Sequence, residues 1–411
     1  MPNARDKGII HDLAAQVAEI AALPIQEQKR DLWRKLNGLK PERPMVAIDQ
    51  VCWNEMNVND ELTLLCEDPE CRRYEDFLRK TLYQWKHFPV DMVVEPFVRV
   101  PKAIHNTGIG VGPVEEVAVT DPTSAVVGHK FVNQFVTDAD LDKIKMATLT
   151  HDEAETARRL EVAHELFDGE LEIFEQGLDP YLSVWDPIST LMSVQDALYT
   201  MIDRPEYMLE LARRIVRSYM GMLDQAEEQG LLCHHQSLIH CTGAYTDELP
   251  APGFDPAKPR TKDIWMFGLA QMLSTVSPEM FEKFEIETSM PIFERFGLVY
   301  YGCCDPLDRK MAQVRKIPNL RKVSMSPWVD EELGASEIGG DFVYSRKPNP
   351  ALLAGVSFDE DLVRDHLQTS VDVCARHGCP LELILKDIST VCYEPWRLWR
   401  WAEIAMEVVG A

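Results

Sequence analysis

Residues 341–386 hold three consecutive segments that decide the fold. "DFVYS" (341–345) and "LELILK" (381–386) are short β-rich runs, and between them "DEDLVRDHLQTSVDVCARHG" (359–378) places apolar residues at helical spacing. Two strands joined by such a helix are typical of a βαβ unit, in which both strands run parallel. We therefore predict an α/β protein with a parallel sheet.

The same alternation of strands and helices extends over most of the chain. About eight such units follow one another without an obvious linker, which favours a single (β/α)8 barrel over an open sheet. We expect an N-terminal helical extension over residues 1–42 and a TIM-like barrel over residues 43–411. A Pro-rich stretch, "ELPAPGFDPAKPR" (248–260), is interpreted as a long loop over the barrel mouth. The other expected strands include 91–100, 180–187, 237–241, 298–302 and 320–326, and the expected helices include 154–167, 204–230 and 277–297.

The composition excludes several classes of partner. The 411 residues carry 42 Lys and Arg against 67 Asp and Glu, which gives a formal net charge of −25. A chain this acidic repels phosphate backbones and anionic lipid surfaces, so we expect neither a nucleic acid nor a membrane as partner. No apolar stretch has the length of a membrane span, the first residues lack a secretory core, and the ten cysteines are irregularly spaced. We therefore expect a cytoplasmic protein with reduced thiols.

Four segments resemble the uroporphyrinogen decarboxylase superfamily, which includes the corrinoid-linked methyltransferases. They are "DMVVEPFVRVPKAIHNTGIGVG" (91–112), "WDPISTLMS" (185–193), "DRPEYMLELARRIVRSYM" (203–220) and "SPEMFEKFEIETSMPIFERFG" (277–297), in the order and spacing of that family. The resemblance runs from about residue 43 to the C-terminus. It implies a single TIM-like barrel with its site at the carboxyl ends of the strands.

One departure from the family pattern favours the methyltransferase branch. The decarboxylase binds substrate carboxylates with an Arg-rich segment near its N-terminus. The matching stretch here, "ERPMVAIDQVCWNEM" (42–56), has no arginine after Arg43 until Arg72. A porphyrinogen with many carboxylates therefore lacks its binding groups, and tetrapyrrole decarboxylation is not the leading interpretation.

The methyltransferase branch implies a zinc site at the end of one strand. There a His-x-Cys-Gly sequence supplies two ligands, and "YYGCC" places Tyr301 at the histidine, Cys303 at the cysteine and Cys304 at the glycine. The family's later zinc cysteine falls near Ser389, with Cys392 a few residues on. One ligand is thus matched and others are shifted or lost.

Zinc needs three or four N, S or O ligands, which in a barrel come from different strand ends. Cys303, Cys304 and His240, at the end of "SLIHC" (237–241), are the candidate metal ligands, with Glu95 as a further contributor. Buried structural thiols are the plain alternative for the cysteines, and a backbone-capping role is equally expected for His240.

Charged residues at other strand ends are candidates for catalysis and substrate binding. Asp305, Lys386 and Asp387 are the expected proton partners, because charges at a barrel strand are costly unless they are paired or functional. A Lys–Glu pair in the barrel wall is the structural alternative for Lys386. Asp186, in the turn that resembles the family's substrate-facing turn, Glu95 and Arg346 are the expected substrate-binding residues.

The resemblance implies a methyltransferase component of a corrinoid-dependent system. It would move a methyl group from a small donor, for example by O-demethylation of a methoxylated aromatic, to a corrinoid carried by a partner protein, with zinc as Lewis acid. The direction of transfer and homodimer formation stay open. The alternatives are a metal-free decarboxylase or lyase that uses Arg346, Lys347 and Lys386, and a barrel that serves only as a binding subunit.

Overall fold

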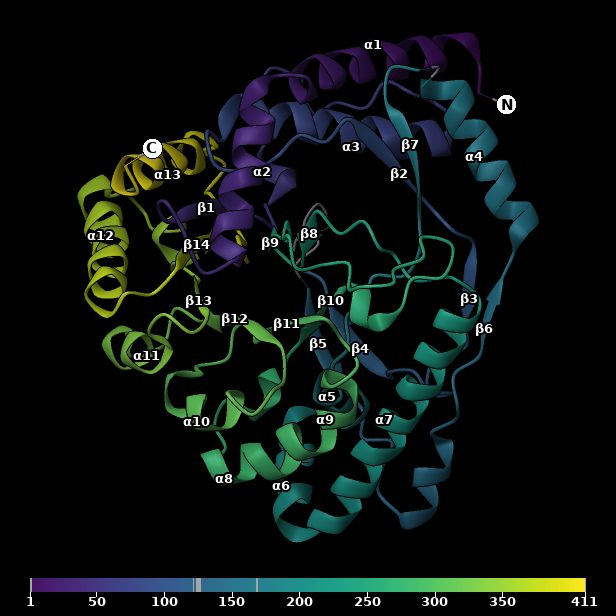
Figure 1. Cartoon of the computed structure of the whole chain (residues 1–411), viewed down its shortest axis with the longest axis vertical. Coiled ribbons are helices and arrows are strands. Elements are labelled where there is room, and N and C mark those ends of the chain that lie inside the picture. The colour runs from purple at the N-terminus through teal and green to yellow at the C-terminus, as the bar shows by residue number, and fades with distance from the viewer. Residues whose placement is uncertain (1, 121, 123–126, 168, 411) are drawn as a thin grey trace.

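The computed structural model describes residues 2–120, 122, 127–167 and 169–410, and Figure 1 shows strands surrounded by helices. Six strands form one parallel sheet in the order β1-β14-β13-β12-β11-β10. This sheet confirms the predicted α/β class. Its strands are β1 (Met45–Ile48), β10 (Trp265–Gly268), β11 (Leu298–Tyr301), β12 (Leu320–Met325), β13 (Val343–Arg346) and β14 (Leu381–Leu385).

The βαβ unit predicted for residues 341–386 is present. β13 pairs in parallel with β14, with Tyr344 opposite Leu381, and α12 (Glu360–His377) connects the two strands. Successive side chains of β14 point to opposite faces. Leu383 joins the main hydrophobic core, whereas Ile384 belongs to a separate cluster on the inner face of the curved sheet. Glu382 and Lys386 share the face of Ile384, as their spacing in the sequence predicts.

The remaining strands do not complete one continuous sheet. β2 (Phe97–Pro101) and β7 (Glu172–Gln176) form a separate parallel pair, and single bridges join Leu178 to Leu232 and Tyr181 to Phe267. Across the described ranges no strand ladder joins β1 to β2, so a closed eight-stranded barrel is not confirmed. The other paired strands are β3 (Ile104–Asn106) with β6 (Leu149–His151), and β4 (Glu115–Ala118) with β5 (Gly128–Phe131).

A short hairpin lies near the centre of the molecule. β8 (Leu238–Ile239) and β9 (Thr242–Gly243) pair antiparallel, and Figure 1 shows them between the six-stranded sheet and the β2–β7 pair. The sequence predicts a strand over 237–241, but the chain turns back at His240, which has a φ of 52°. The two-residue turn explains the difference, since it needs positive φ and carries no glycine to announce it.

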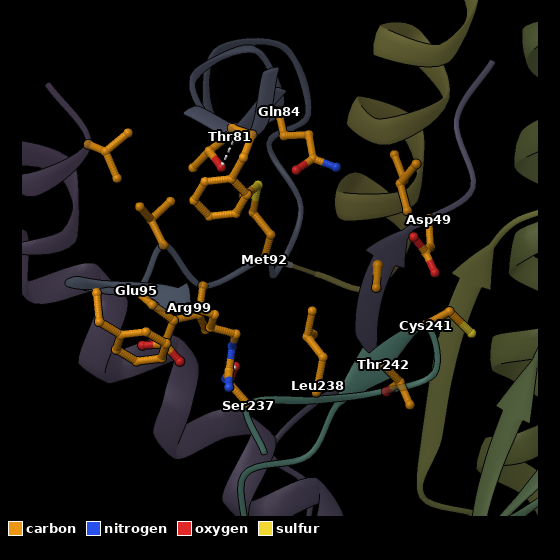
Figure 2. A pocket seen from close by; sticks show the side chains of 18 of the residues that line it. Asp49, Thr81, Gln84, Met92, Glu95, Arg99, Ser237, Leu238, Cys241 and Thr242 are labelled. Atoms are coloured by element: carbon orange, nitrogen blue, oxygen red, sulfur yellow. Dashed lines mark hydrogen bonds between the residues drawn. The ribbon is translucent and has the colours of Figure 1, made fainter. Parts of the chain in front are cut away.

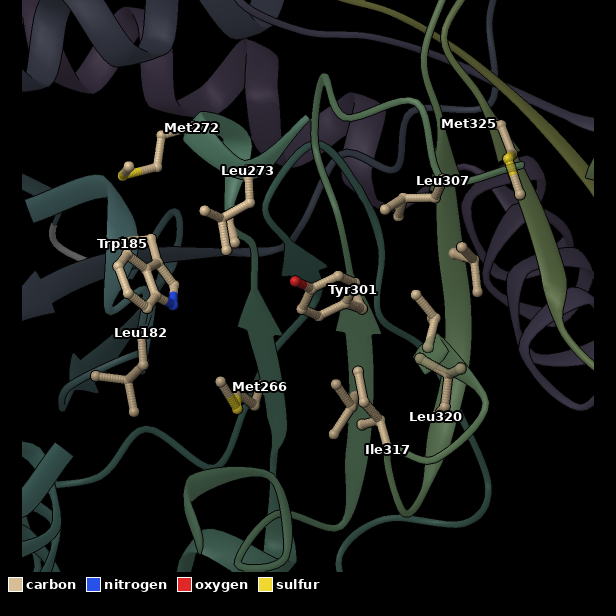
Figure 3. Packing of buried hydrophobic residues seen from close by; sticks show 14 of the residues in the cluster. Leu182, Trp185, Met266, Met272, Leu273, Tyr301, Leu307, Ile317, Leu320 and Met325 are labelled. Atoms are coloured by element: carbon tan, nitrogen blue, oxygen red, sulfur yellow. The ribbon is translucent and has the colours of Figure 1, made fainter. Parts of the chain in front are cut away.

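Helices cover the outer face of the sheet. Figure 3 shows the packing of that face, where Trp185, Met266 and Tyr301 lie among buried aliphatic side chains. The helices are α1 (Ala4–Ala21), α2 (Pro24–Asn37), α3 (Pro69–His87), α4 (Glu153–Phe167), α5 (Trp185–Met192), α6 (Val194–Asp203), α7 (Pro205–Glu228), α8 (Pro278–Phe281), α9 (Glu287–Phe293), α10 (Met311–Val314), α11 (Glu331–Ile338), α12 and α13 (Trp396–Val408).

Three sequence predictions need correction. In 180–187 only Tyr181 makes a strand-like bridge, because α5 begins at Trp185. The helix expected over 277–297 contains a π-helical segment, Glu282–Ile286, between α8 and α9. The Pro-rich loop does not cover the mouth: Glu248 pairs with Arg321 beside the first residue of β12, at the amino ends of the strands.

No single described helix is both long enough and apolar enough to cross a membrane. The bent pair of α1 and α2, which meet at 62°, meets that test only when the two are counted together, on length and composition alone.

Candidate active site

Three segments that are far apart in the sequence meet at the carboxyl ends of the strands. Cys303 and Cys304 follow β11, Lys386 follows β14, and His240 lies at the hairpin tip. The Sγ atom of Cys303 lies 2.7 Å from Lys386 Nζ, 3.5 Å from His240 Nε2 and 3.7 Å from Cys304 Sγ. We call these four residues the thiol cluster. The structure brings together residues that the sequence singled out separately, and their roles stay predictions.

A tight turn fixes the direction of the Cys303 side chain. Gly302 has a φ of 89°, and a Cβ atom there would lie 2.5 Å from Leu307 Cδ1, so the position requires glycine. The Cys303 N–H donates to Asp305 Oδ2 at 3.0 Å, and the Ser324 hydroxyl donates to the Cys303 carbonyl at 2.5 Å. These contacts hold the buried thiol toward the inner face of the sheet.

The thiol cluster is open to solvent on the side where Asp387 lies. Cys304 donates to Asp387 Oδ2 at 3.1 Å, and Lys386 Nζ lies 3.4 Å from the same carboxylate oxygen. The Asp387 side chain is 48% exposed, whereas that of Lys386 is 2% exposed. The cluster is therefore buried on one side and open on the other.

The contacts of Cys303 stabilise its thiolate form. Hydrogen bonding to Cys304, and then to His240 and Lys386, holds the pKa of Cys303 well below its usual range, although burial opposes this. Burial also opposes the charged form of His240, but hydrogen bonds to Cys241 and Cys303 raise its pKa to about 9. An ammonium group, an imidazolium group and a thiolate thus coexist near neutral pH.

Three carboxyl groups that interact electrostatically with one another retain protons at unusually high pH. Burial is the main cause, and it raises the pKa of Asp305 to about 6, of Asp186 to about 7 and of Glu285 to about 8. Asp305 Oδ1 is buried without a hydrogen-bond partner, which disfavours the charged form of this carboxyl group. The proton of Asp186 is therefore held to about neutral pH, and that of Asp305 to slightly acidic pH.

Two aromatic side chains form a stack with the imidazole ring of His240. Its imidazole stacks on Phe267 at 4.1 Å between centroids and 13° between planes, and Tyr181 stacks on Phe267 at 5.3 Å. Sequence reasoning missed Phe267, Tyr181, Glu285 and Ser324. The inner-face position of Phe267 on β10 was the one available signal, because alternation along the strand predicts it.

The zinc expectation can be tested against these distances. Around tetrahedral zinc, with Zn–S of about 2.3 Å and Zn–N of about 2.0 Å, donor atoms lie roughly 3.5–3.8 Å apart. The Cys303–His240 and Cys303–Cys304 distances of 3.5 and 3.7 Å match. However, Lys386 Nζ lies 2.7 Å from Cys303 Sγ and 3.2 Å from His240 Nε2, in the space a cation would take. As arranged, these side chains do not fit zinc, and no trio of His, Cys, Asp or Glu among the described residues is placed to hold a metal.

Two residues expected to bind substrate are held in ion pairs elsewhere. Arg346 is buried and donates to Glu331 Oε1 at 2.5 Å. Glu95 accepts from Arg30 at 2.8 Å and from the Tyr245 hydroxyl at 2.6 Å. Neither contacts the thiol cluster, because helices α11 and α2 supply partners that strand-end reasoning does not see.

The positions aligned with other family zinc ligands also lie apart from the thiol cluster. The Tyr301 hydroxyl donates to Glu285 Oε1 at 3.0 Å on the outer face of the sheet. Cys392 is exposed, with its sulfur 3.4 Å from the Ala354 carbonyl. Neither side chain therefore extends the set of possible ligands.

A cavity of about 450 Å³ lies between α3, the ends of β1 and β2, and the hairpin. His240 lines it and so joins the cavity to the thiol cluster. Its wall is mainly apolar, and Figure 2 shows it with Met92 and Leu238 on opposite sides. Its polar lining includes Asp49, Thr81, Gln84, Glu95, Arg99, Ser237 and Thr242.

Comparison with known proteins gives one likeness to report. No family model and no curated sequence matches this chain. Among solved structures, a methyltransferase from Methanosarcina mazei is similar over 92% of this chain and 97% of that chain, with 11% sequence identity and a TM-score of 0.48. Similarity at that level supports no assignment of site residues, so the candidate site is supported by its own geometry alone.

Proposed function

We propose that this chain is a methyltransferase that moves a methyl group from a small donor to a corrinoid carried by a partner protein. The thiol cluster is the observation that supports this proposal, with a thiolate, an ammonium and an imidazolium beside a mainly apolar cavity. A methoxylated aromatic is the donor class that such a cavity suits. The proposed fold is the barrel type in which catalytic groups gather at the carboxyl ends of strands.

Loss of a methyl group leaves an anion that the enzyme must stabilise. The corrinoid supplies the nucleophile that accepts the methyl group. Lys386 and His240 carry positive charge beside the cavity and stabilise the departing oxygen or sulfur. Asp186, with a pKa of about 7, and the protonated fraction of Asp305, with a pKa of about 6, then supply the proton that completes the leaving group.

Zinc is a separate part of the proposal. The sequence resemblance supports it, and the distances among Cys303, Cys304 and His240 suit it, but Lys386 would have to leave the cluster. Metal analysis of the purified chain tests it: about one zinc per chain, lost on Cys304→Ser, would support a metal site. A metal-free chain that gains no activity from added zinc would leave Lys386 as the cation of the site.

The experiment that tests the transfer uses free reduced cobalamin as acceptor. Methoxyarenes, methylamines and methylthiols are offered in turn, and methylcobalamin formation is followed spectroscopically. We expect one donor class to react, and Cys303→Ala to slow that reaction by about 100-fold, because Cys303 holds Lys386 and His240 in place. Cys392→Ser, which removes an exposed thiol elsewhere, is the matched control. No methylation from any donor, or full activity in Cys303→Ala, would contradict the proposal.

The two alternative functions gain less support. The decarboxylase or lyase needs Arg346 and Lys347, but Arg346 is paired with Glu331 and Lys347 is buried against Tyr300 and Ser345. Neither base is free to hold a substrate. A binding subunit without activity would show tight association with a partner and no turnover in the same assay.

A further inference from the structure

Arg99 is the cation of the cavity without an acidic partner. Its Nη2 donates to the Ser237 hydroxyl at 2.9 Å, and its guanidinium lies over Phe97 and Phe174, at 5.0 and 5.3 Å from their centroids. No carboxylate among the described residues lies within 4.0 Å of it. A half-buried guanidinium with free N–H groups is a ready binding group for an anion, since five donors in a planar fork match a carboxylate.

Most other charges that line the cavity already have partners. Asp91 is held by both terminal nitrogens of Arg43, at 2.9 and 2.6 Å. Glu95 is held by Arg30 and Tyr245, as described above. Arg73 lies 3.9 Å from Glu70 and has a side chain that is 52% exposed.

Asp49 is the remaining acid of the wall. It follows β1, and Figure 2 shows it across the cavity from Arg99 and Ser237. The Arg99 side of the cavity therefore carries an uncompensated positive charge.

We infer that Arg99 and Ser237 form a subsite for a small monocarboxylate with an apolar body. The carboxylate binds the guanidinium fork, and the body lies against the apolar wall that includes Met92 and Leu238. His240 lines the same cavity, so the far end of such a ligand approaches the thiol cluster. That this ligand is the methyl donor rests on the proposed function; the anion subsite itself does not.

Calorimetry with matched ligands tests the subsite directly. 4-Methoxybenzoate and 4-methoxybenzamide share a body and differ in charge, and acetate lacks the body. We expect 4-methoxybenzoate to bind with a Kd of about 1 mM or lower. The amide should bind about 10- to 100-fold more weakly, because a hydrogen-bonded charge contributes on that scale. Acetate should also bind more weakly than the benzoate.

Variants separate Arg99 from the general charge of the cavity. Arg99→Gln should weaken 4-methoxybenzoate about 10- to 100-fold and leave the amide unchanged, and Arg99→Lys should lose less. Arg73→Gln removes the same charge from the same cavity and should change the Kd by less than about threefold. Unchanged melting temperatures of the free variants confirm that they fold.

The outcomes distinguish this inference from the proposed function. Equal affinity for the acid and the amide, no effect of Arg99→Gln, or no binding of either ligand overturns the subsite. Charge-selective binding that Arg99→Gln removes establishes it, even where no methyl group reaches cobalamin, in which case the proposed function fails alone. If the chain binds no carboxylate and Arg99→Gln transfers methyl groups from uncharged donors at the wild-type rate, the subsite fails and the proposed function stands.

Discussion

Two regions of the inner face bury a lysine beside an anionic partner, and they differ in what surrounds the pair. In the interior, Lys322 on β12 bonds Glu382 on β14 at 2.8 Å, Thr242 at 3.0 Å and the Gly243 carbonyl at 3.1 Å. Both charged side chains are fully buried. At the mouth, Lys386 bonds Cys303 and lies beside the half-exposed Asp387.

The difference separates a structural charge pair from a candidate catalytic one. All three N–H donors of Lys322 are used, and neither Lys322 nor Glu382 lines the cavity next to the hairpin. Lys386 instead contacts His240, which does line it. Burial of a charge alone therefore does not distinguish a candidate site here, whereas contact with a residue that lines the cavity does distinguish Lys386 from Lys322.

The interior pair should give the largest effect on stability. Lys322→Met leaves Glu382 as an unpaired buried carboxylate and should lower the free energy of unfolding by about 3–5 kcal/mol. Denaturant unfolding monitored by circular dichroism measures it. The double variant Lys322→Met with Glu382→Leu should recover most of that loss, because neither member of the pair is then left without the other. A double variant as unstable as the single one would show that the pair is not the cause.

The mouth pair should show the opposite balance between stability and activity. Lys386→Met should lower methyl transfer to cobalamin about 100-fold. It should lower the unfolding free energy at neutral pH by less than Lys322→Met does, because the Cys303 thiolate can take up a proton once Lys386 is gone. Ultraviolet absorbance of the thiolate during a pH titration measures the accompanying rise in the Cys303 pKa. A loss of stability as large as that of Lys322→Met would remove the distinction between the two regions.

Glu285 is a third buried ionisable group. Unlike the two lysines, it has no partner of opposite charge within ion-pair distance among the described residues. Its pKa is raised by burial from 4.5 to about 8, so the folded chain holds a proton that the unfolded chain releases between these pH values. Stability should therefore fall as pH rises from about 4.5 to 8. Glu285→Gln should become the more stable protein over that range, by about 2–4 kcal/mol at pH 8, from about 1.4 kcal/mol per pKa unit.

Urea unfolding of both proteins at several pH values between 5 and 8 measures this difference. A constant difference between wild type and Glu285→Gln would mean that the carboxyl ionises normally in the folded chain.

The smallest effect is expected at the turn that positions Cys303. Ser324→Ala removes the hydrogen bond to the Cys303 carbonyl and should cost about 1 kcal/mol of stability. Methyl transfer should fall only a few-fold, since the thiolate keeps Lys386 and His240. Thermal unfolding and the cobalamin assay measure both; an activity loss equal to that of Lys386→Met would assign the main positioning role to Ser324.

The parallel sheet was predictable because local patterns determine it. Strand–helix alternation and the βαβ unit at 341–386 depend on residues close in sequence, and both are present. Proximity of Cys303 and Lys386 also followed, since carboxyl ends of parallel strands lie at one edge. The 2.7 Å contact between them did not, because the curvature of the sheet across two intervening strands sets it.

Long-range partners explain what sequence reasoning could not supply. Arg346 ends β13 as expected, whereas Glu95 precedes β2, and Glu331 and Arg30 from helices pair with them. Arg99 was missed because either face of β2 could have met the cavity. The position of His240 was also not predictable, because the two-residue turn of the hairpin contains no glycine to mark it.

The position of His240 at the hairpin tip has a consequence for the order in which the site assembles during folding. His240 is 63 residues from Cys303 in sequence, and Lys386 is 83 residues beyond Cys303, so the sulfur meets Lys386 only after the last strand has docked. An incomplete chain that ends before β14 would lack the lysine contact and display a less acidic thiol. The acidity of one sulfur atom thus serves as an internal reporter of finished folding.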